Sequence, residues 1–206
     1  DLPNYGVFDE KRVFDAGPAP GPISFKGVRL GVPICEDVWT PDVVECLAET
    51  GAEIIVVPNG SPFERTKFDR RMDLAVARVV ESGLPFVYVN QVCGQDELVF
   101  DGGSFVLNAD RTLALQMQTF VEGMELSHWT RGPSGWVCAP GAKAVNEEGL
   151  AAVYQAMMLG LRDYVNKNRF PGVVLGLSGG IDSALSAAVA VDALGAERVR
   201  CVMMPS

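Results

Sequence analysis

The stretch VVLGLSGGIDS, residues 173–183, decides the fold of the C-terminal part of the chain. Its first five residues form an apolar run of the length of a buried strand, and the serine and glycines that follow indicate a turn. A helical pattern then covers residues 182–194, and a second apolar run covers residues 199–203. This strand–helix–strand order predicts two parallel strands joined by a right-handed crossover.

The turn in this stretch has the chemistry of a phosphate-binding loop. Gly179 and Gly180 let the backbone approach a phosphate closely, and the N-terminus of the next helix offers unpaired N–H groups. Ser178 and Ser183 add hydroxyl groups, and Asp182 supplies a carboxylate of the kind that binds Mg²⁺. The lysine of the G-x-x-x-x-G-K-[ST] loop is missing, so γ-phosphoryl transfer in that style is not indicated. The alternative is an ordinary glycine turn with Asp182 as the helix cap.

N-terminal to this unit, apolar runs of strand length alternate with segments of helical periodicity. This alternation is typical of an α/β domain. The predicted strands cover residues 28–34, 53–58, 85–90, 103–107 and 112–117, and the predicted helices cover residues 40–51 and 66–82.

The periodicity fails between about residue 121 and residue 146, where glycine and proline interrupt the pattern. A helical pattern with a broad apolar stripe resumes over residues 147–168. The sequence therefore predicts a first domain over residues 1–122, a linker over residues 123–146 and a second domain over residues 147–206.

The composition excludes several classes of function. The 206 residues are 48% hydrophobic with a net charge of −9, so a basic nucleic-acid-binding surface is not expected. The five cysteines form no Cys-x-x-Cys pair, which argues against zinc or a disulfide framework and favours a reducing cytoplasm. No apolar run approaches the ~18 residues of a membrane span. The first residues do not resemble a signal peptide, and both ends are expected to be internal cuts in a longer chain.

Cys35 is the candidate nucleophile. It follows the predicted strand at residues 28–34 and precedes a turn and a helix. Such a junction holds a side chain out of a sheet, where a substrate carbonyl can reach it. The alternative is a small buried hydrophobic residue, the usual state of a free cysteine. The other four cysteines are interpreted as core or loop residues.

Motifs along most of the chain resemble one family. GVPICEDVW at residues 31–39 is similar to the nucleophile segment of nitrilase-type glutaminases, and LPNYGVFDEKR at residues 2–12 and the segment 90–105 match the same group. AMMLGLRDYV at residues 156–165 and GLSGGIDSAL at residues 176–185 resemble the beginning of an NAD synthetase domain of the ATP pyrophosphatase type. The fused order, glutaminase and then synthetase, is typical of the glutamine-dependent NAD synthetases.

This resemblance implies the fold class and the nucleophile. The fold is expected to be α/β, with part of a nitrilase-like α-β-β-α sandwich followed by the first β-α-β unit of a Rossmann-like ATP pyrophosphatase domain. The chemistry implied is that of a Glu–Lys–Cys triad with Cys35 as nucleophile, Glu as general base and Lys stabilising the tetrahedral intermediate. In the family that Glu and Lys precede the Leu-Pro-Asn-Tyr motif, outside this chain. Glu10 and Lys11 are therefore interpreted as solvated residues or as residues behind the site.

The resemblance also implies which side chains recognise glutamine. By motif position these are Tyr5, Ser61 and Lys67, since a hydroxyl group and a cation suit an α-carboxylate. For Ser61 the alternative is an ordinary turn serine, and for Lys67 it is a surface cation near a helix start. Cys93 occupies a position where the family motif leads us to expect glycine.

For the second domain, the resemblance implies ATP and Mg²⁺ as cofactors and glutamine and deamido-NAD as substrates. Asp182 is expected to bind the Mg²⁺ ion. The partners are expected to be small molecules, with no nucleic acid and no membrane, and the complete enzyme is expected to be a homo-oligomer. The residues implied to bind ATP are Gly176, Leu177, Ser178, Gly179, Gly180, Ile181, Asp182 and Ser183.

The function expected on this basis is the ATP-dependent amidation of deamido-NAD to NAD with ammonia from glutamine, with release of AMP, pyrophosphate and glutamate. One rival is another glutamine amidotransferase with the same loop, such as a GMP or asparagine synthetase. A tRNA-modifying pyrophosphatase is a second rival, although its basic surface conflicts with the charge of −9. A catalytically degenerate scaffold is a third.

Overall fold

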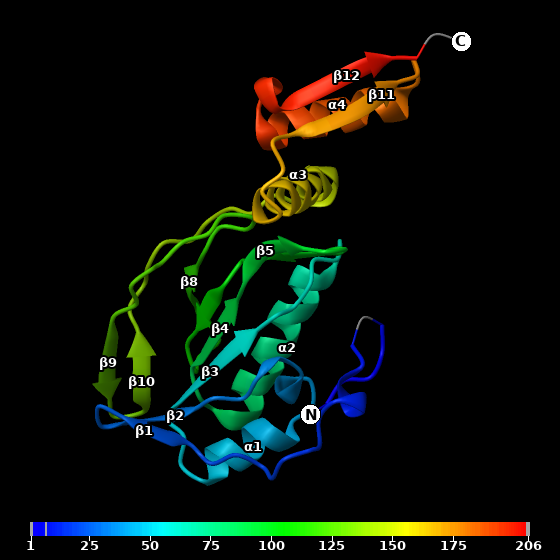
Figure 1. The fold of residues 1–206 in the computed structure, drawn as a ribbon. Coiled ribbons are helices and arrows are strands. Elements are labelled where there is room, and N and C mark those ends of the chain that lie inside the picture. The colour runs from blue at the N-terminus through cyan, green and yellow to red at the C-terminus, as the bar shows by residue number, and fades with distance from the viewer. Residues whose placement is uncertain (1, 7, 205–206) are drawn as a thin grey trace.

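A six-stranded sheet organises the N-terminal part of the molecule (Figure 1). The structure is a computed structural model that describes residues 2–6 and 8–204. Across the sheet, the strands lie in the order β1 (Ile23–Phe25), β2 (Val28–Gly31), β3 (Ile54–Asn59), β4 (Phe86–Asn90), β7 (Phe105–Leu107) and β8 (Leu113–Gln116). The three central strands β2, β3 and β4 are parallel, and the other pairings are antiparallel.

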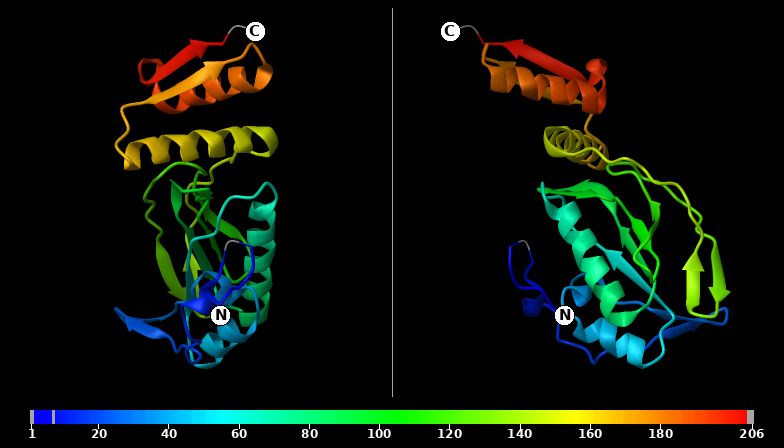
Figure 2. Two further views of the ribbon diagram at one scale, coloured as in Figure 1. Left: turned by 45° about the vertical axis from the view of Figure 1, so that its right-hand side comes forward. Right: turned by 180° about the vertical axis from the view of Figure 1, so that it is seen from behind.

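Two helices, α1 (Asp42–Glu49) and α2 (Lys67–Ser82), pack against one face of this sheet (Figure 2). Both have an apolar stripe along one side, which is why they bury that side against the strands. α2 ends where the sequence pattern predicts, because Gly83 adopts a left-handed conformation with φ 67° and closes the last turn. The fully buried side chains between the helices and the sheet include Val44, Leu47, Ile55, Val57, Val79, Phe86, Phe105 and Leu107.

The predicted strand at residues 28–34 is shorter in the structure. Its ladder with β3 ends at Gly31, which pairs with Ile55, and Pro33 has no N–H group with which to extend the ladder. The Ile34 N–H instead donates to the Asp37 carboxylate at 2.9 Å. This bond begins a short 3₁₀ helix, η2 (Cys35–Val38). The expectation that Cys35 directly ends a strand is therefore wrong by a few residues.

Three hairpins were not indicated by the sequence pattern. β1, over which no strand was predicted, pairs with β2, and β5 (Val92–Gln95) pairs with β6 (Leu98–Asp101). The third joins β9 (Trp129–Gly132) to β10 (Gly135–Cys138) inside the expected linker. Strands of three or four residues are too short to show a clear alternating pattern, so pairing with a neighbour is what forms them.

The segment after β10 returns along the six-stranded sheet. The Gln116 N–H donates to the Ala142 carbonyl, and the Ala144 N–H donates to the Gln116 carbonyl. Cys138 is fully buried against Val106 and Leu115. Much of the segment 123–146 therefore packs against the first part of the chain.

The C-terminal part is a helix followed by a β-α-β unit. These elements are α3 (Gly149–Lys167), β11 (Val173–Leu177), α4 (Ile181–Leu194) and β12 (Val199–Met203). β11 and β12 are parallel, as the sequence predicts, and α3 lies between the six-stranded sheet and the β-α-β unit (Figures 1 and 2). None of the helices in the described part of the chain has the length and apolar character needed to cross a membrane.

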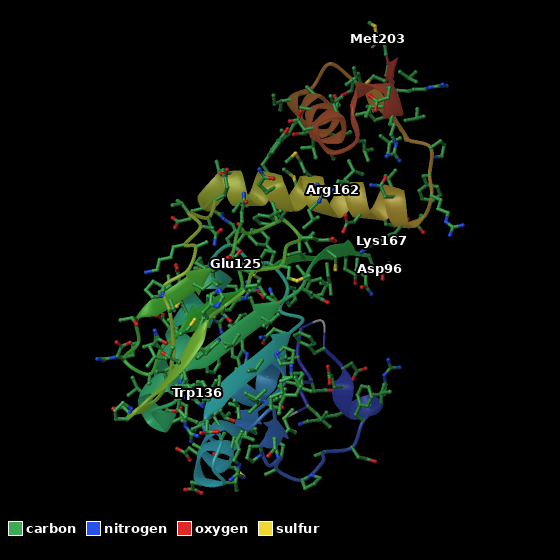
Figure 3. The ribbon with its side chains drawn as sticks, turned by 90° about the vertical axis from the view of Figure 1, so that its left-hand side faces the viewer. Asp96, Glu125, Trp136, Arg162, Lys167 and Met203 are labelled. Atoms are coloured by element: carbon green, nitrogen blue, oxygen red, sulfur yellow. The ribbon has the colours of Figure 1, made fainter. Side chains whose placement is uncertain are left out.

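α3 packs on the β5–β6 hairpin through a close glycine contact. A Cβ atom added at Gly94 would lie 2.7 Å from the Cα atom of Gly160, so only glycine fits there without a shift. The Gly94 N–H donates to the Asp163 carboxylate at 2.8 Å, and Lys167 Nζ donates to the Gly94 carbonyl at 2.6 Å. Figure 3 shows Lys167 on α3 beside the turn of this hairpin, which carries Asp96.

Candidate active site

The backbone at Cys35 has the geometry of a strained nucleophile turn. Cys35 begins η2 just beyond β2, and its φ is 47°, in the left-handed region that residues with a side chain rarely adopt. Such a conformation costs on the order of 1–3 kcal/mol and persists only where the surrounding structure fixes it. The side chain is half-buried and lines a cavity of about 1240 Å³ formed with the N-terminal segment. This placement favours a functional thiol over a core residue.

The surroundings of the Cys35 thiol raise and lower its pKa by opposing effects. Burial is the largest effect and raises the pKa above its ordinary value. Hydrogen bonds from the backbone N–H groups of Gly60 and Glu36 and the nearby charge of Lys67 favour the thiolate, while the Glu36 carboxylate opposes it. Because the balance is a raised pKa, the thiol needs a general base to react near neutral pH.

Tyr5, the first of the residues expected to recognise glutamine, lines the same cavity as Cys35. Its hydroxyl group donates to Glu36 Oε1 at 2.6 Å. Burial and this hydrogen bond raise the pKa of Tyr5 to about 12, so the phenol stays protonated at any ordinary pH. Glu36 was not among the predicted site residues, although its position next to the nucleophile was a signal. Its carboxylate lines the cavity and suits a substrate ammonium group.

Lys67 is a buried cation within electrostatic reach of Cys35. The residue is 8% exposed, so the interpretation as a surface cation is wrong. Its Nζ donates to Glu64 Oε1 at 2.8 Å, and this contact lowers the pKa of Glu64. One carboxylate leaves other Nζ hydrogens of Lys67 free to bind a second anion.

The Ser61 side chain is bonded within the protein interior and does not line the cavity. It is 5% exposed and is not among the residues that line the cavity at Cys35. Its Oγ accepts a hydrogen bond from Arg71 Nε at 3.0 Å, and its N–H donates to Asn90 Oδ1 at 2.9 Å. Ser61 is, however, the direct neighbour of Gly60, whose N–H reaches the Cys35 sulfur. The structure thus brings Tyr5 into the cavity at Cys35, Lys67 within electrostatic range of the thiol, and Ser61 next to Gly60.

Glu10 and Lys11 belong to the N-terminal segment of the cavity wall. They belong to the 3₁₀ helix η1 (Glu10–Arg12), where Lys11 is exposed. Both residues line the cavity. Among the described residues, no hydrogen bond joins Lys11 to Cys35. This is compatible with their interpretation as solvated residues.

Arg71 is the polar residue that sequence reasoning missed. Its side chain is 2% exposed, and Nη1 donates to both carboxylate oxygens of Asp101 at 2.9 Å. Nη2 donates to the carbonyl groups of Ser61 and Pro62 at 2.8 and 3.0 Å. Removing one partner of a buried ion pair typically costs about 3–5 kcal/mol, because the other charge remains buried. No motif or spacing marks Arg71, since its partners come from distant segments.

The second candidate site is the loop between β11 and α4. Gly179 has φ 83°, with no atom within 4 Å of an added Cβ, so the backbone side of the loop is open. Gly180 is the N-cap residue and makes no side-chain cap, so the first N–H groups of α4 remain available to an anion. Ser178 Oγ and Ser183 Oγ lie 3.3 Å apart. The donors fit a phosphate group.

Asp182 projects from the first turn of α4 and is exposed. Because Gly180 is the N-cap, the alternative that Asp182 caps the helix is wrong. Within the described residues its carboxylate has no hydrogen-bond partner, and no cluster of three metal-binding side chains forms. A carboxylate of this kind suits Mg²⁺ that is held mainly by phosphate oxygens and water.

The sheet, its helical layer and the cysteine turn define the class of protein. The chain belongs to the carbon-nitrogen hydrolase family, whose model matches residues 1–128. The NAD synthase family model matches residues 153–206, which include most of α3 and the β-α-β unit with the candidate phosphate loop.

Relatives carry both parts in the same order. The chain is 51% identical over 205 residues to the glutamine-dependent NAD(+) synthetase of Rhodobacter capsulatus, which covers 100% of this chain and 37% of that protein. The solved structure of the glutamine-dependent NAD+ synthetase from Acinetobacter baumannii with adenosine diphosphate matches with a TM-score of 0.92 and 45% identity, over 100% of this chain and 39% of that one. A carbon-nitrogen hydrolase from Helicobacter pylori shares the fold of 57% of this chain and 46% of its own, at a TM-score of 0.54 and 24% identity. The chain thus spans under two fifths of the length of the synthetases it matches.

Proposed function

We propose that this chain is part of a glutamine-dependent NAD synthetase that converts deamido-NAD to NAD with ammonia taken from glutamine. The observation that carries the proposal is the joining, in one chain, of a strained half-buried cysteine facing a cavity with a serine–glycine phosphate loop. The likeness to synthetases along the whole chain supports the same combination of activities.

In the first reaction, Cys35 Sγ attacks the side-chain carbonyl carbon of glutamine. A carbon–sulfur bond forms, the carbon–nitrogen bond breaks, and the nitrogen takes a proton and leaves as ammonia. Water then cleaves the thioester to glutamate and the free thiol. The Gly60 N–H and the Lys67 charge, which favour the thiolate, also suit the negative charge that develops during attack. Tyr5 and Glu36 would orient the amino acid end of the substrate, and their hydrogen bond to each other at the cavity supports this role.

In the second reaction, the β11–α4 loop binds ATP. The carboxylate of deamido-NAD attacks the α-phosphorus, pyrophosphate leaves, and ammonia then displaces AMP to give the amide. The residues proposed to hold the phosphates are Gly176–Ser183, through backbone N–H groups and the hydroxyl groups of Ser178 and Ser183. Asp182 would bind Mg²⁺, which supplies positive charge at the phosphates.

The test separates the two nitrogen sources in the full-length protein. Cys35→Ala is expected to lower glutamine-dependent NAD synthesis on the order of 10³-fold or more, because only binding and the oxyanion donors remain. Synthesis from added ammonium salt should be unchanged. Cys46→Ala, which alters another half-buried thiol on α1, is the matched control and should change neither rate.

Two outcomes would contradict the proposal. An equal loss with glutamine and with ammonium would mean that Cys35 serves the fold or the synthetase reaction. Absence of synthesis in the unmodified protein with either source would favour a catalytically degenerate scaffold.

A further inference from the structure

The turn at residues 60–62 brings a backbone N–H group to the sulfur of Cys35, yet nothing within the turn fixes its position. Gly60 has no side chain, Pro62 has no N–H group, and the Ser61 hydroxyl group is turned away to Arg71. The position of the Gly60 N–H therefore depends on what lies beneath the turn.

Arg71 lies beneath it and makes most of the contacts. Three of its donors reach this turn: Nε to Ser61 Oγ, and Nη2 to the Ser61 and Pro62 carbonyl oxygens. The planar fork of a guanidinium group fixes these acceptors relative to one another, which a lysine ammonium group cannot do.

Asp101 and Asn90 also help to fix the turn at residues 60–62. Asp101 binds the opposite edge of the Arg71 guanidinium through Nη1, and among the described residues its side chain makes no hydrogen bond to the turn itself. Asn90 accepts from the Ser61 N–H and donates to the Ser61 carbonyl at 3.1 Å. All of these groups are buried, so water does not compete for the bonds and the network stays in one arrangement.

We propose that Arg71 is a positioning residue for the nucleophile, because its guanidinium group holds the Gly60–Pro62 turn in the place from which it donates to Cys35. The inference rests on the proposed glutaminase function of Cys35 and deepens it. Arg71 touches neither the sulfur nor the cavity; it acts through the turn.

The decisive experiment compares Arg71→Lys with Arg78→Lys in the full-length protein. Arg78 lies on the same helix and is also buried, but it bonds Glu81 and not the turn. Both variants keep the positive charge. Arg71→Lys is expected to lower kcat for glutamine hydrolysis by on the order of tenfold to hundredfold, because the N–H donor that stabilises the Cys35 thiolate is no longer held in place, with a smaller change in KM. Ammonium-dependent synthesis should not change. Arg78→Lys should leave both reactions as they are.

A second measurement does not depend on glutamine as substrate. The rate at which iodoacetamide alkylates Cys35 is followed against pH, and its midpoint reports the thiol pKa. The titratable or charged groups around Cys35 are Tyr5, Glu36, Lys67 and Tyr88, and the other such groups that line its cavity are Glu10, Lys11, Asp15 and Asp37. None of them is changed in the variant, so an upward shift of the midpoint in Arg71→Lys reports the lost Gly60 donor.

Asp101→Asn extends the test should Arg71→Lys fold poorly. This substitution keeps the shape of the side chain and loosens only the anchor of Arg71, so the same changes are expected with smaller size. The inference is overturned if folded Arg71→Lys, or folded Asp101→Asn in its place, keeps the original kcat and alkylation profile. It is also overturned if Arg78→Lys causes equal changes. Failure of the nitrogen-source test at Cys35 would instead count against the proposed function.

Discussion

The two candidate sites of this molecule are built in opposite ways. The Cys35 site draws on the N-terminal segment, η2, the turn after β3, and α2, and beneath it lies a buried network that reaches β4 and β6. The phosphate loop uses residues 176–183 alone, which are mostly exposed and bond chiefly to each other.

This difference follows from what each site must do. A phosphate loop needs unpaired N–H groups at a helix start, and a strand, two glycines and a helix provide these locally. A nucleophilic thiol needs a specific pKa and a donor aimed at the reacting atom, and these come from groups that only the fold brings together. A substitution near Cys35 should therefore also change the positions of residues on other elements. A substitution in the loop should change only the loop itself.

Among the substitutions that test this comparison, the largest loss of activity is expected at Asp182. In the full-length protein, Asp182→Ala should lower NAD synthesis on the order of 10²-fold or more with either nitrogen source, since a group that stabilises phosphate charge is lost. Glutamine hydrolysis should persist. Asp192→Ala removes the same side chain from the other end of α4, where it bonds Tyr154, and serves as the control. Near-normal synthesis by Asp182→Ala would show that the loop works without a metal-binding carboxylate.

A loss of stability, intermediate in size, is expected at Gly94, where the β5–β6 hairpin meets α3. A Cβ atom there would come within 2.7 Å of the α3 backbone, so Gly94→Ala should reduce the free energy of unfolding by about 1–3 kcal/mol. Denaturant titration of the full-length protein measures this. Gly132→Ala is the control, because a Cβ atom on that strand glycine has its nearest neighbour at 3.7 Å. Equal stability of the two variants would mean that α3 does not depend on this contact.

The smallest effect is expected at Tyr5. Tyr5→Phe removes the hydroxyl group that bonds Glu36, and KM for glutamine should rise about fivefold with little change in kcat, because a partly exposed hydrogen bond contributes little. Tyr154→Phe, which removes the bond to Asp192 far from the cavity, is the control.

The contribution of the Tyr5 hydroxyl group to glutamine binding should depend on pH in one direction. The pKa of Tyr5 is raised to about 12 from an ordinary value near 10. The hydrogen bond to Glu36 is therefore fully present below pH 10 and is lost only as the pH approaches 12. A KM for glutamine in the unmodified protein that rises with a midpoint near pH 10, and does not do so in Tyr5→Phe, would contradict this placement of Tyr5.

The sequence determined the local features of this protein. The parallel β11–α4–β12 unit, α1, α2, α3 and the central strands follow from apolar periodicity within single segments. The candidate phosphate loop could also be proposed from the sequence, because its potential donors lie within eight consecutive residues. The Cys35 motif predicts a nucleophile, and the structure brings Tyr5 and Lys67, which the motif positions singled out, near Cys35.

Tertiary structure decided the rest. Cys35 lies beyond the end of β2 because the ladder stops at Gly31, and the short hairpins form only by pairing with neighbours. Lys67 is buried rather than exposed, and the Ser61 hydroxyl group bonds Arg71 rather than facing the cavity. Arg71 gave no signal in the sequence, because the partners of a buried guanidinium group are set by which distant backbone and side-chain oxygens the fold brings within about 3 Å.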